Sequence, residues 1–493
     1  MRVILLTGKL MEKKVKKIAS KYGYDVFVAP VDVALFAKPE MVNLEKKYDL
    51  LILPGEMKNA DEFEKATGIK TVLGTKNIED LDLLLSNLKK IEKKLSKQKP
   101  ACELIRDELK RGTEIILRKV EEKEYIEKKV DYRKNIFIGN IPVGVDFPIR
   151  VIAEIVNVDK LSSDQILNRA RYFKENGADI IDLGFSEENP EKVEETINLL
   201  RTHNVAPLSI DTKEPENIEC AINSGIDLIL SFDGELLRKF KNVEIPSVVI
   251  PSHSDLPEDI EARVGMLCRN IELAKKRNFR FIIADPILNP INMGFVDSIL
   301  AYKKIYERHA IPTMMGVGNV VELIDADSIG VNAVLCGIAS ECGVCLVLTP
   351  EHSDKAKGSV RELSLASKMM FLSRVRRSPP KDLGMDLLVV KEKRIKKLDV
   401  EIKGKVIKAE EKDGYIPDKK GFFKIFVKDD KIICVHYSKS TTPIIIEGKE
   451  AKEICDTIVR LGLVSNIEHA MYIGRELSKA EFALRYGKSY IQD

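Results

Sequence analysis

Short apolar segments alternate with longer amphipathic segments through the middle of the chain. Each apolar segment has the length of a β-strand and is followed by a polar loop and a segment of helical periodicity. Eight such units over about 225 residues fit a closed parallel barrel. The sequence therefore predicts a (β/α)8 TIM barrel over residues 149–376. The predicted strands are residues 151–156, 179–183, 207–210, 227–230, 246–250, 280–284, 311–315 and 344–348.

The segment before the barrel has a different pattern. Residues 1–90 begin with apolar runs at 2–7 and 49–54 that are separated by charged helical segments, which predicts a Rossmann-like α/β domain. Gly8 and Gly55 follow two of these runs but do not form a GxGxxG motif, so tight turns are the favoured reading of both glycines.

Two further regions complete the chain. Residues 91–148 are rich in Lys and Glu at helical spacing, which predicts a charged helical connection. Residues 380–493 change to strand-like runs followed by two helical segments, so we expect a C-terminal α+β domain with Asp429 and Asp430 in a hairpin turn. The expected strands are residues 403–411, two strands within 421–438, and 442–448; the expected helices are 449–461 and 467–485.

Charge and composition exclude several classes of function. The chain has 493 residues, with 80 Lys and Arg against 77 Asp and Glu, and no basic stripe studded with aromatic residues. This balance argues against a nucleic-acid partner. The N-terminus has only a short apolar run before a charged helix, so we expect neither a signal peptide nor a membrane span. We therefore expect a cytoplasmic protein.

Polar side chains follow nearly every predicted barrel strand, where the fold places its chemistry. Carboxylates and amides predominate, and a carboxylate can accept a fork of two hydrogen bonds. A barrel mouth of this kind suits a small heterocycle with several N–H donors, such as a pterin. The residues are Asn157, Asp211, Lys213, Ser231, Asp233, His253, Asp285, Asn319, His352, Lys355 and Arg361.

Four segments of the chain resemble dihydropteroate synthase in order and spacing: EIVNV, ENGADIIDLG, SIDTKEPENIECAINSGIDLIL and FIIADPILN. The layout of domains resembles that of archaeal dihydropteroate synthase-related proteins. The resemblance implies a reduced pterin as substrate or cofactor, with Asp211 and Asp285 binding its amino and ring N–H groups. It places Asn157 near a diphosphate and Mg²⁺, and His352 at the diphosphate. The alternative for the two aspartates is that they cap the helices that follow.

The chain also departs from the synthase pattern. The Thr-Arg pair expected after the second strand is replaced by residues 186–188, the Asn after the fourth strand is missing near Ser231, and no Lys follows the seventh strand. Fewer basic groups weaken the case for expelling a diphosphate. The segment GVGNV instead resembles pterin-dependent methyltransferases, in which an Asn at the position of Asn319 hydrogen-bonds near the methyl-bearing nitrogen.

Three functions remain open. The first is condensation of a dihydropterin methyl diphosphate with an arylamine in methanopterin or folate biosynthesis, with Lys213 and His352 as catalytic residues. In this reading Asp211, Asp285, Asn319 and Ser231 hold the pterin, while Asn157, His253, Lys355 and Arg361 contact phosphate or substrate. The second is transfer of a methyl or other one-carbon group from a tetrahydropterin to an acceptor. The third is pterin binding or assembly without catalysis. Related barrels often form homodimers, but the sequence itself shows no interface.

One cysteine cluster suggests a metal site. Cys336, Cys342 and Cys345 have the spacing C-x5-C-x2-C, which suits zinc or an iron–sulfur cluster. A fourth ligand is not evident, and Cys345 begins an apolar strand, so buried thiols are favoured.

Overall fold

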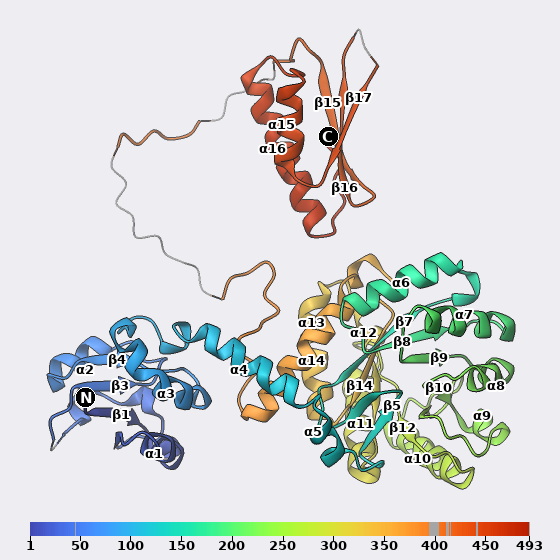
Figure 1. Cartoon of the computed structure of the whole chain (residues 1–493), viewed down its shortest axis with the longest axis horizontal. Helices are drawn as coiled ribbons and strands as arrows, with labels where there is room; N and C mark the ends of the chain where they lie inside the picture. Colours follow the sequence, from blue (N-terminus) through green and yellow to red (C-terminus); the bar gives the residue numbers. More distant parts are fainter. Residues whose placement is uncertain (45, 394–403, 411–413, 415, 440–441, 493) are drawn as a thin grey trace. The chain divides into compact units, whose positions relative to one another are not determined.

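The computed structural model describes residues 1–44, 46–393, 404–410, 414, 416–439 and 442–492. The chain forms two compact units, Met1–Lys393 and Arg394–Asp493. The first unit contains an N-terminal α/β domain and the central barrel, and the second contains the C-terminal sheet and its helices (Figure 1).

A four-stranded parallel sheet organises the N-terminal domain, as the fold prediction required. Its strand order is β2-β1-β3-β4, and α1 (Glu12–Ser20), α2 (Ala60–Thr67) and α3 (Leu81–Ile91) accompany it. Both faces are buried, because the strand residues divide between two apolar clusters. The strands are β1 (Val3–Thr7), β2 (Asp25–Val28), β3 (Leu50–Leu53) and β4 (Thr71–Leu73).

The charged connection contains helices α4 (Arg106–Lys119) and α5 (Lys123–Lys129), and also a hairpin that was not predicted. This hairpin consists of β5 (Asn135–Ile138) and β6 (Ile141–Gly144). Its apolar side chains, including Ile136 and Val143, pack in one cluster with the inward-facing residues of the barrel strands. The strands have only four residues each, too short for a clear alternating pattern, and they close the N-terminal end of the barrel.

The eight predicted barrel strands are all present, each within three residues of its expected bounds, so the TIM barrel is confirmed. The hydrogen-bonded order is β12-β11-β10-β9-β8-β7-β14-β13, every pairing is parallel, and a bridge between Ala284 and Thr313 joins β12 to β13. The strands are β7 (Arg150–Ile155), β8 (Ile180–Gly184), β9 (Leu208–Asp211), β10 (Leu228–Phe232), β11 (Ser247–Val249), β12 (Ile282–Ala284), β13 (Met314–Gly316) and β14 (Leu346–Thr349).

Helices surround the barrel and cover its outer face (Figure 1). They are α6 (Ser163–Glu175), α7 (Pro190–Thr202), α8 (Pro215–Asn223), α9 (Gly234–Lys239), α10 (Ile260–Lys276), α11 (Phe295–His309), α12 (Gly318–Val321), α13 (Ser328–Glu341) and α14 (Ser359–Arg376). Among the described residues, no helix is long and apolar enough to cross a membrane.

The C-terminal unit is an antiparallel sheet of β15 (Phe422–Lys428), β16 (Lys431–Tyr437) and β17 (Ile444–Gly448), with helices α15 (Ala451–Arg460) and α16 (Ile467–Arg485). Asp429 and Asp430 form the predicted turn, both with positive φ, as hairpin turns require. The strand predicted at 403–411 is wrong for residues 404–410, which contain no strand. Val406 and Ile407 are 90% and 79% exposed there, so no apolar surface stabilises a strand. Residues 403 and 411 lie outside the described part.

Candidate active site in the barrel

A pocket of about 460 Å³ lies beyond the carboxyl ends of β7, β8 and β9. Half-buried Glu154 and Asp211 line it, together with exposed Asn157, Lys213 and His253. Four of the residues predicted for the site by their position after strands are thus brought together: Asn157, Asp211, Lys213 and His253. The hairpin covers the other end of the barrel, so the pocket lies at the opposite, carboxyl end.

The alternation of side chains along a strand explains why carboxylates reach the barrel interior. Ile152 on β7 and Ile180 on β8 point inward, into the apolar cluster that the hairpin covers. Glu154 and Asp182 are each two residues further along their strands, and they are paired in the sheet register. They therefore also point inward, one layer nearer the carboxyl end.

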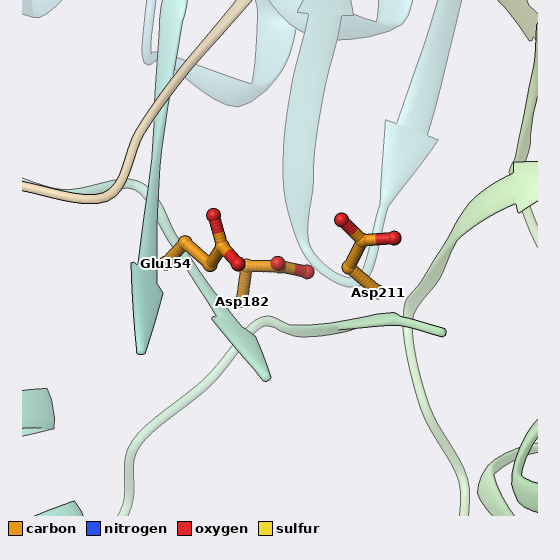
Figure 2. A group of neighbouring side chains, drawn as sticks. All are labelled: Glu154, Asp182 and Asp211. Carbon is orange, nitrogen blue, oxygen red and sulfur yellow. The ribbon is translucent and has the colours of Figure 1, made fainter. Parts of the chain in front are cut away.

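Three carboxylates meet in this layer. Figure 2 shows Glu154, Asp182 and Asp211 extending from neighbouring strands toward a common space. One oxygen atom of each lies within 4.8 Å of the others. Asp182 is fully buried; its Oδ1 accepts a hydrogen bond from the Ser209 hydroxyl at 2.5 Å, while its Oδ2 has no partner.

Burial and mutual repulsion shift the titration of this cluster. Burial, together with the charge of Asp211, raises the pKa of Glu154 to about 7. Burial raises the pKa of Asp211 to about 6, although the nearby His253 opposes the shift. Burial and the charges of both neighbours raise the pKa of Asp182 well above its usual value. An empty pocket at neutral pH thus holds crowded negative charge, which a ligand with N–H donors or a cation would relieve.

We predict that Asp182→Asn stabilises the folded chain at pH 8 and not at pH 4.5. A carboxyl group whose folded pKa is raised favours folding below its unfolded pKa, and that contribution is lost as the pH rises through the folded pKa. Removing one charge from the cluster should therefore raise the free energy of unfolding at pH 8 and leave it nearly unchanged at pH 4.5. Urea titration at both pH values measures this difference. Asp164→Asn, an exposed carboxyl in the first turn of α6, serves as control. Equal stability of Asp182→Asn and wild type at pH 8 would contradict the prediction.

Asp285, the second predicted pterin ligand, is buried after β12. Its Oδ1 accepts hydrogen bonds from the Tyr302 hydroxyl at 2.6 Å and from the backbone N–H of Ile287 at 2.7 Å. Burial raises its pKa to about 6, and the charge of Asp211 contributes, so the two aspartates are electrostatic neighbours. The helix-cap alternative fails for Asp211, since α8 begins after Glu214 with no side-chain cap.

The residues at the pocket mouth have defined backbone positions. Asn157 lies two residues after β7 with φ +53, in the left-handed region that Asn tolerates better than most residues, and a 3-10 turn follows it. The ring Nε2 of His253 lies 3.0 Å from the backbone oxygen of buried Ser231. The Asp233 carboxylate caps α9 by accepting the N–H groups of Glu235 and Leu236, both at 3.0 Å.

The loop after β13 does not place its predicted pterin-binding residue, Asn319, in the pocket lining. Asn319 lies in the short helix α12, and its side-chain amide donates to the backbone oxygen of Leu288 at 2.9 Å. Among the described residues that line the pocket, Asn319 does not occur.

The loop after β14 uses its donors internally. The backbone N–H groups of His352 and Ser353 donate to Glu322 at 2.8 and 3.1 Å, and Lys355 pairs with Asp325 at 2.8 Å. The buried Glu351 carboxylate accepts the N–H groups of Gly358 and Val360 at the start of α14. These backbone N–H groups, beside the side chains predicted to contact phosphate, are therefore occupied by carboxylates of the chain.

His352, Lys355 and Arg361 are also absent from the described lining of the barrel pocket. All three side chains are exposed on this loop and on the first turn of α14. Of the basic and imidazole groups predicted for the site, Lys213 and His253 are the two that line it.

The three cysteines are buried thiols. Cys336, Cys342 and Cys345 are 0%, 6% and 1% exposed, and burial raises the pKa of Cys336 and of Cys345 to about 12. Among the described residues, the grouping with metal-ligand geometry is the carboxylate cluster, and the three cysteines are not part of it.

The sequence did not single out Glu154 and Asp182. Both sit inside apolar runs, VIAEIV and DIIDL, which were used only to locate strands. A carboxylate within an otherwise apolar strand could have pointed to them. A strand of this kind is buried on both faces, and a buried carboxylate needs a hydrogen-bonding partner, a cation or a functional role.

Two regions of the chain match known families. Residues 156–264 match the pterin binding enzyme family, and residues 417–493 match the family described as PterinBD-DUF4346. The uncharacterized protein MJ0107 of Methanocaldococcus jannaschii is 39% identical over 529 aligned residues, which cover 100% of this chain and 98% of the relative. This chain belongs to the same family. Its barrel is a pterin binding enzyme domain, as the resemblance implied.

Weaker matches occur elsewhere. The uncharacterized protein ycf91 of Porphyra purpurea is 31% identical over 85 residues, covering 15% of this chain and 70% of the relative. Dihydropteroate synthase of Xanthomonas albilineans in complex with 7,8-dihydropteroate is 18% identical, with a TM-score of 0.39 over 50% of this chain and 100% of that chain. The Thermus thermophilus synthase in complex with 4-aminobenzoate is 18% identical, with a TM-score of 0.36 over 47% and 97%.

Proposed function

We propose that this pterin binding enzyme condenses a dihydropterin methyl diphosphate with an arylamine. The observation that carries the proposal is the division of the barrel pocket into a half-buried acidic part and an exposed part with Lys213 and His253. The amino and ring N–H groups of a pterin would donate to Asp211 and Glu154, which both line the acidic part of the pocket. The diphosphate would then lie at the mouth.

This reaction requires the protein to position the two substrates and to stabilise the charge of the leaving diphosphate. The arylamine nitrogen attacks the methylene carbon of the pterin, a C–N bond forms, and the C–O bond to diphosphate breaks with its electron pair leaving on the diphosphate. The arylamine nitrogen loses a proton. Lys213 and His253 would hold the leaving group and stabilise its charge as the bond breaks.

Mg²⁺ would add positive charge at the same place. Asn157 and Glu154 both line the pocket, and amide and carboxylate oxygens are the hard ligands that this cation takes. When bound, the cation would supply charge neutralisation to the diphosphate. His352, Lys355 and Arg361 have no part in this version of the site, and His253 takes the place first given to His352.

The test is diphosphate release from purified full-length protein supplied with a dihydropterin methyl diphosphate, 4-aminobenzoate and Mg²⁺. We expect release that depends on the arylamine, and a kcat lower by about 10- to 100-fold in Lys213→Gln, because one electrostatic contact to the leaving group is lost. Lys160→Gln, an exposed lysine in the loop after β7, is the matched control. Absence of release would refute the condensation, and tighter binding of a methylated tetrahydropterin than of the diphosphate would favour methyl transfer.

A further inference from the structure

A second cavity, of about 410 Å³, lies in the N-terminal domain and shares no residue with the barrel pocket. Thr7 and Gly8 after β1, Pro54 after β3, and the loop after β4 line it. The chain passes from β1 to β2 on one side and then to β3 on the other, so the cavity lies where the direction of winding reverses. Open parallel sheets bind ligands at this place.

The entrance to this cavity is unusually apolar. Four large side chains that line it are exposed to solvent: Leu10 by 71%, Met11 by 49%, Val33 by 39% and Leu35 by 45%. Leu10, Met11 and Leu35 lie in two short 3-10 turns, at Lys9–Met11 and Ala34–Phe36, and Val33 directly precedes the second turn. Exposed apolar side chains gathered around an opening indicate an apolar partner, and the volume is that of a small-molecule site.

Charge is distributed unevenly between the two ends of the cavity. Lys76 follows β4, and Asp32 follows β2; these strands are the opposite edges of the sheet. Two other lining carboxylates already have cationic partners, since Glu56 pairs with Lys381 at 2.9 Å and Glu79 pairs with Lys14.

A second cation belongs to the β4 end. Arg377 lines the cavity and follows α14, in a segment that packs on the loop after β4. Arg376 pairs with buried Asp80 at 3.2 Å, and the backbone oxygen of Lys381 accepts from the Asn77 amide at 3.4 Å. The cavity thus has two cations at one end, a carboxylate at the other and apolar walls between them.

We propose that this cavity is a second ligand site, for an elongated aromatic molecule with an anionic group at one end and a hydrogen-bond donor at the other. The ring system packs between the apolar side chains at the entrance. Its anion pairs with Lys76 and Arg377, and its donor is accepted by Asp32.

Fluorescence titration of the full-length protein with 6-amino-2-naphthoate tests this assignment. We expect saturable binding that is weakened about tenfold or more in Lys76→Gln/Arg377→Gln, because the anion loses both partners. The neutral probe 6-amino-2-naphthamide should bind the wild type and this double variant equally. Asp32→Asn should abolish the preference for 6-amino-2-naphthoate over 2-naphthoate.

Three controls separate the site from other binding. Lys65→Gln, an exposed lysine in the last turn of α2, should leave the affinity unchanged. Asp211→Asn should also leave it unchanged, which distinguishes this site from the barrel pocket. Leu10→Ser, at a side chain too exposed to affect folding, should weaken both naphthalene carboxylates several-fold. Absence of saturable binding, or an unchanged affinity in the double variant, would overturn the proposal.

Discussion

Asp211→Asn is expected to weaken the binding of a dihydropterin methyl diphosphate by at least about 100-fold. A hydrogen bond to a charged acceptor contributes about 1.5–3 kcal/mol, and a carboxylate facing a pterin edge accepts two. The asparagine retains one acceptor oxygen and turns an N–H group toward the pterin donors. Titration calorimetry with the full-length protein and Mg²⁺ measures the change.

The pH dependence of binding provides an internal check on that result. Burial raises the pKa of Asp211 to about 6 and, with the charge of Asp211, that of Glu154 to about 7. An ionised carboxylate accepts from two N–H donors, whereas a protonated carboxyl turns an O–H group toward one of them, so affinity should rise between pH 5 and pH 8. Asp211→Asn should show a flatter profile, and Asp164→Asn, on the exposed start of α6, should follow the wild type. An Asp211→Asn affinity within threefold of wild type would remove Asp211 from the binding site.

The barrel was predictable because its strands are continuous apolar runs separated by helix-length segments. Such runs locate strands, and the fold then states which strand ends share a face. Asp211 and Lys213, which this rule selects, line the pocket. The rule does not say which loop residues reach the centre, and for this reason Asn319 and His352 were assigned to the pocket although the structure does not place them in its lining.

Residues inside strands were harder to assess. Whether Glu154 and Asp182 point into the barrel depends on strand register, and a shift of one residue reverses every side chain. Their proximity to Asp211 further depends on pairing across three strands, which one sequence does not reveal. The hairpin β5–β6 was missed for a related reason, because its role is to cover apolar residues that belong to other segments.

Glu351→Leu is expected to lower the free energy of unfolding by about 4 kcal/mol, since each buried donor left without an acceptor costs about 1–3 kcal/mol. Glu351 is 3% exposed and accepts from the Tyr172 hydroxyl at 2.6 Å and from the N–H groups of Gly358 and Val360 at 2.7 and 3.1 Å. It therefore connects α6 to the start of α14 and holds the loop between β14 and α14 in place. Urea unfolding, followed by the loss of helical circular dichroism, measures the effect.

Glu322→Leu is the matched control for Glu351→Leu. Glu322 also accepts two backbone N–H groups, those of His352 and Ser353, but it is half-exposed, so water can replace it. We expect a loss of about 1 kcal/mol or less for this variant. An equal loss of unfolding free energy in the two variants would mean that the contribution of Glu351 to stability does not depend on its burial. A larger loss at Glu351 would instead establish that this loop is held by an internal carboxylate, in a place where the sequence suggested a site for phosphate.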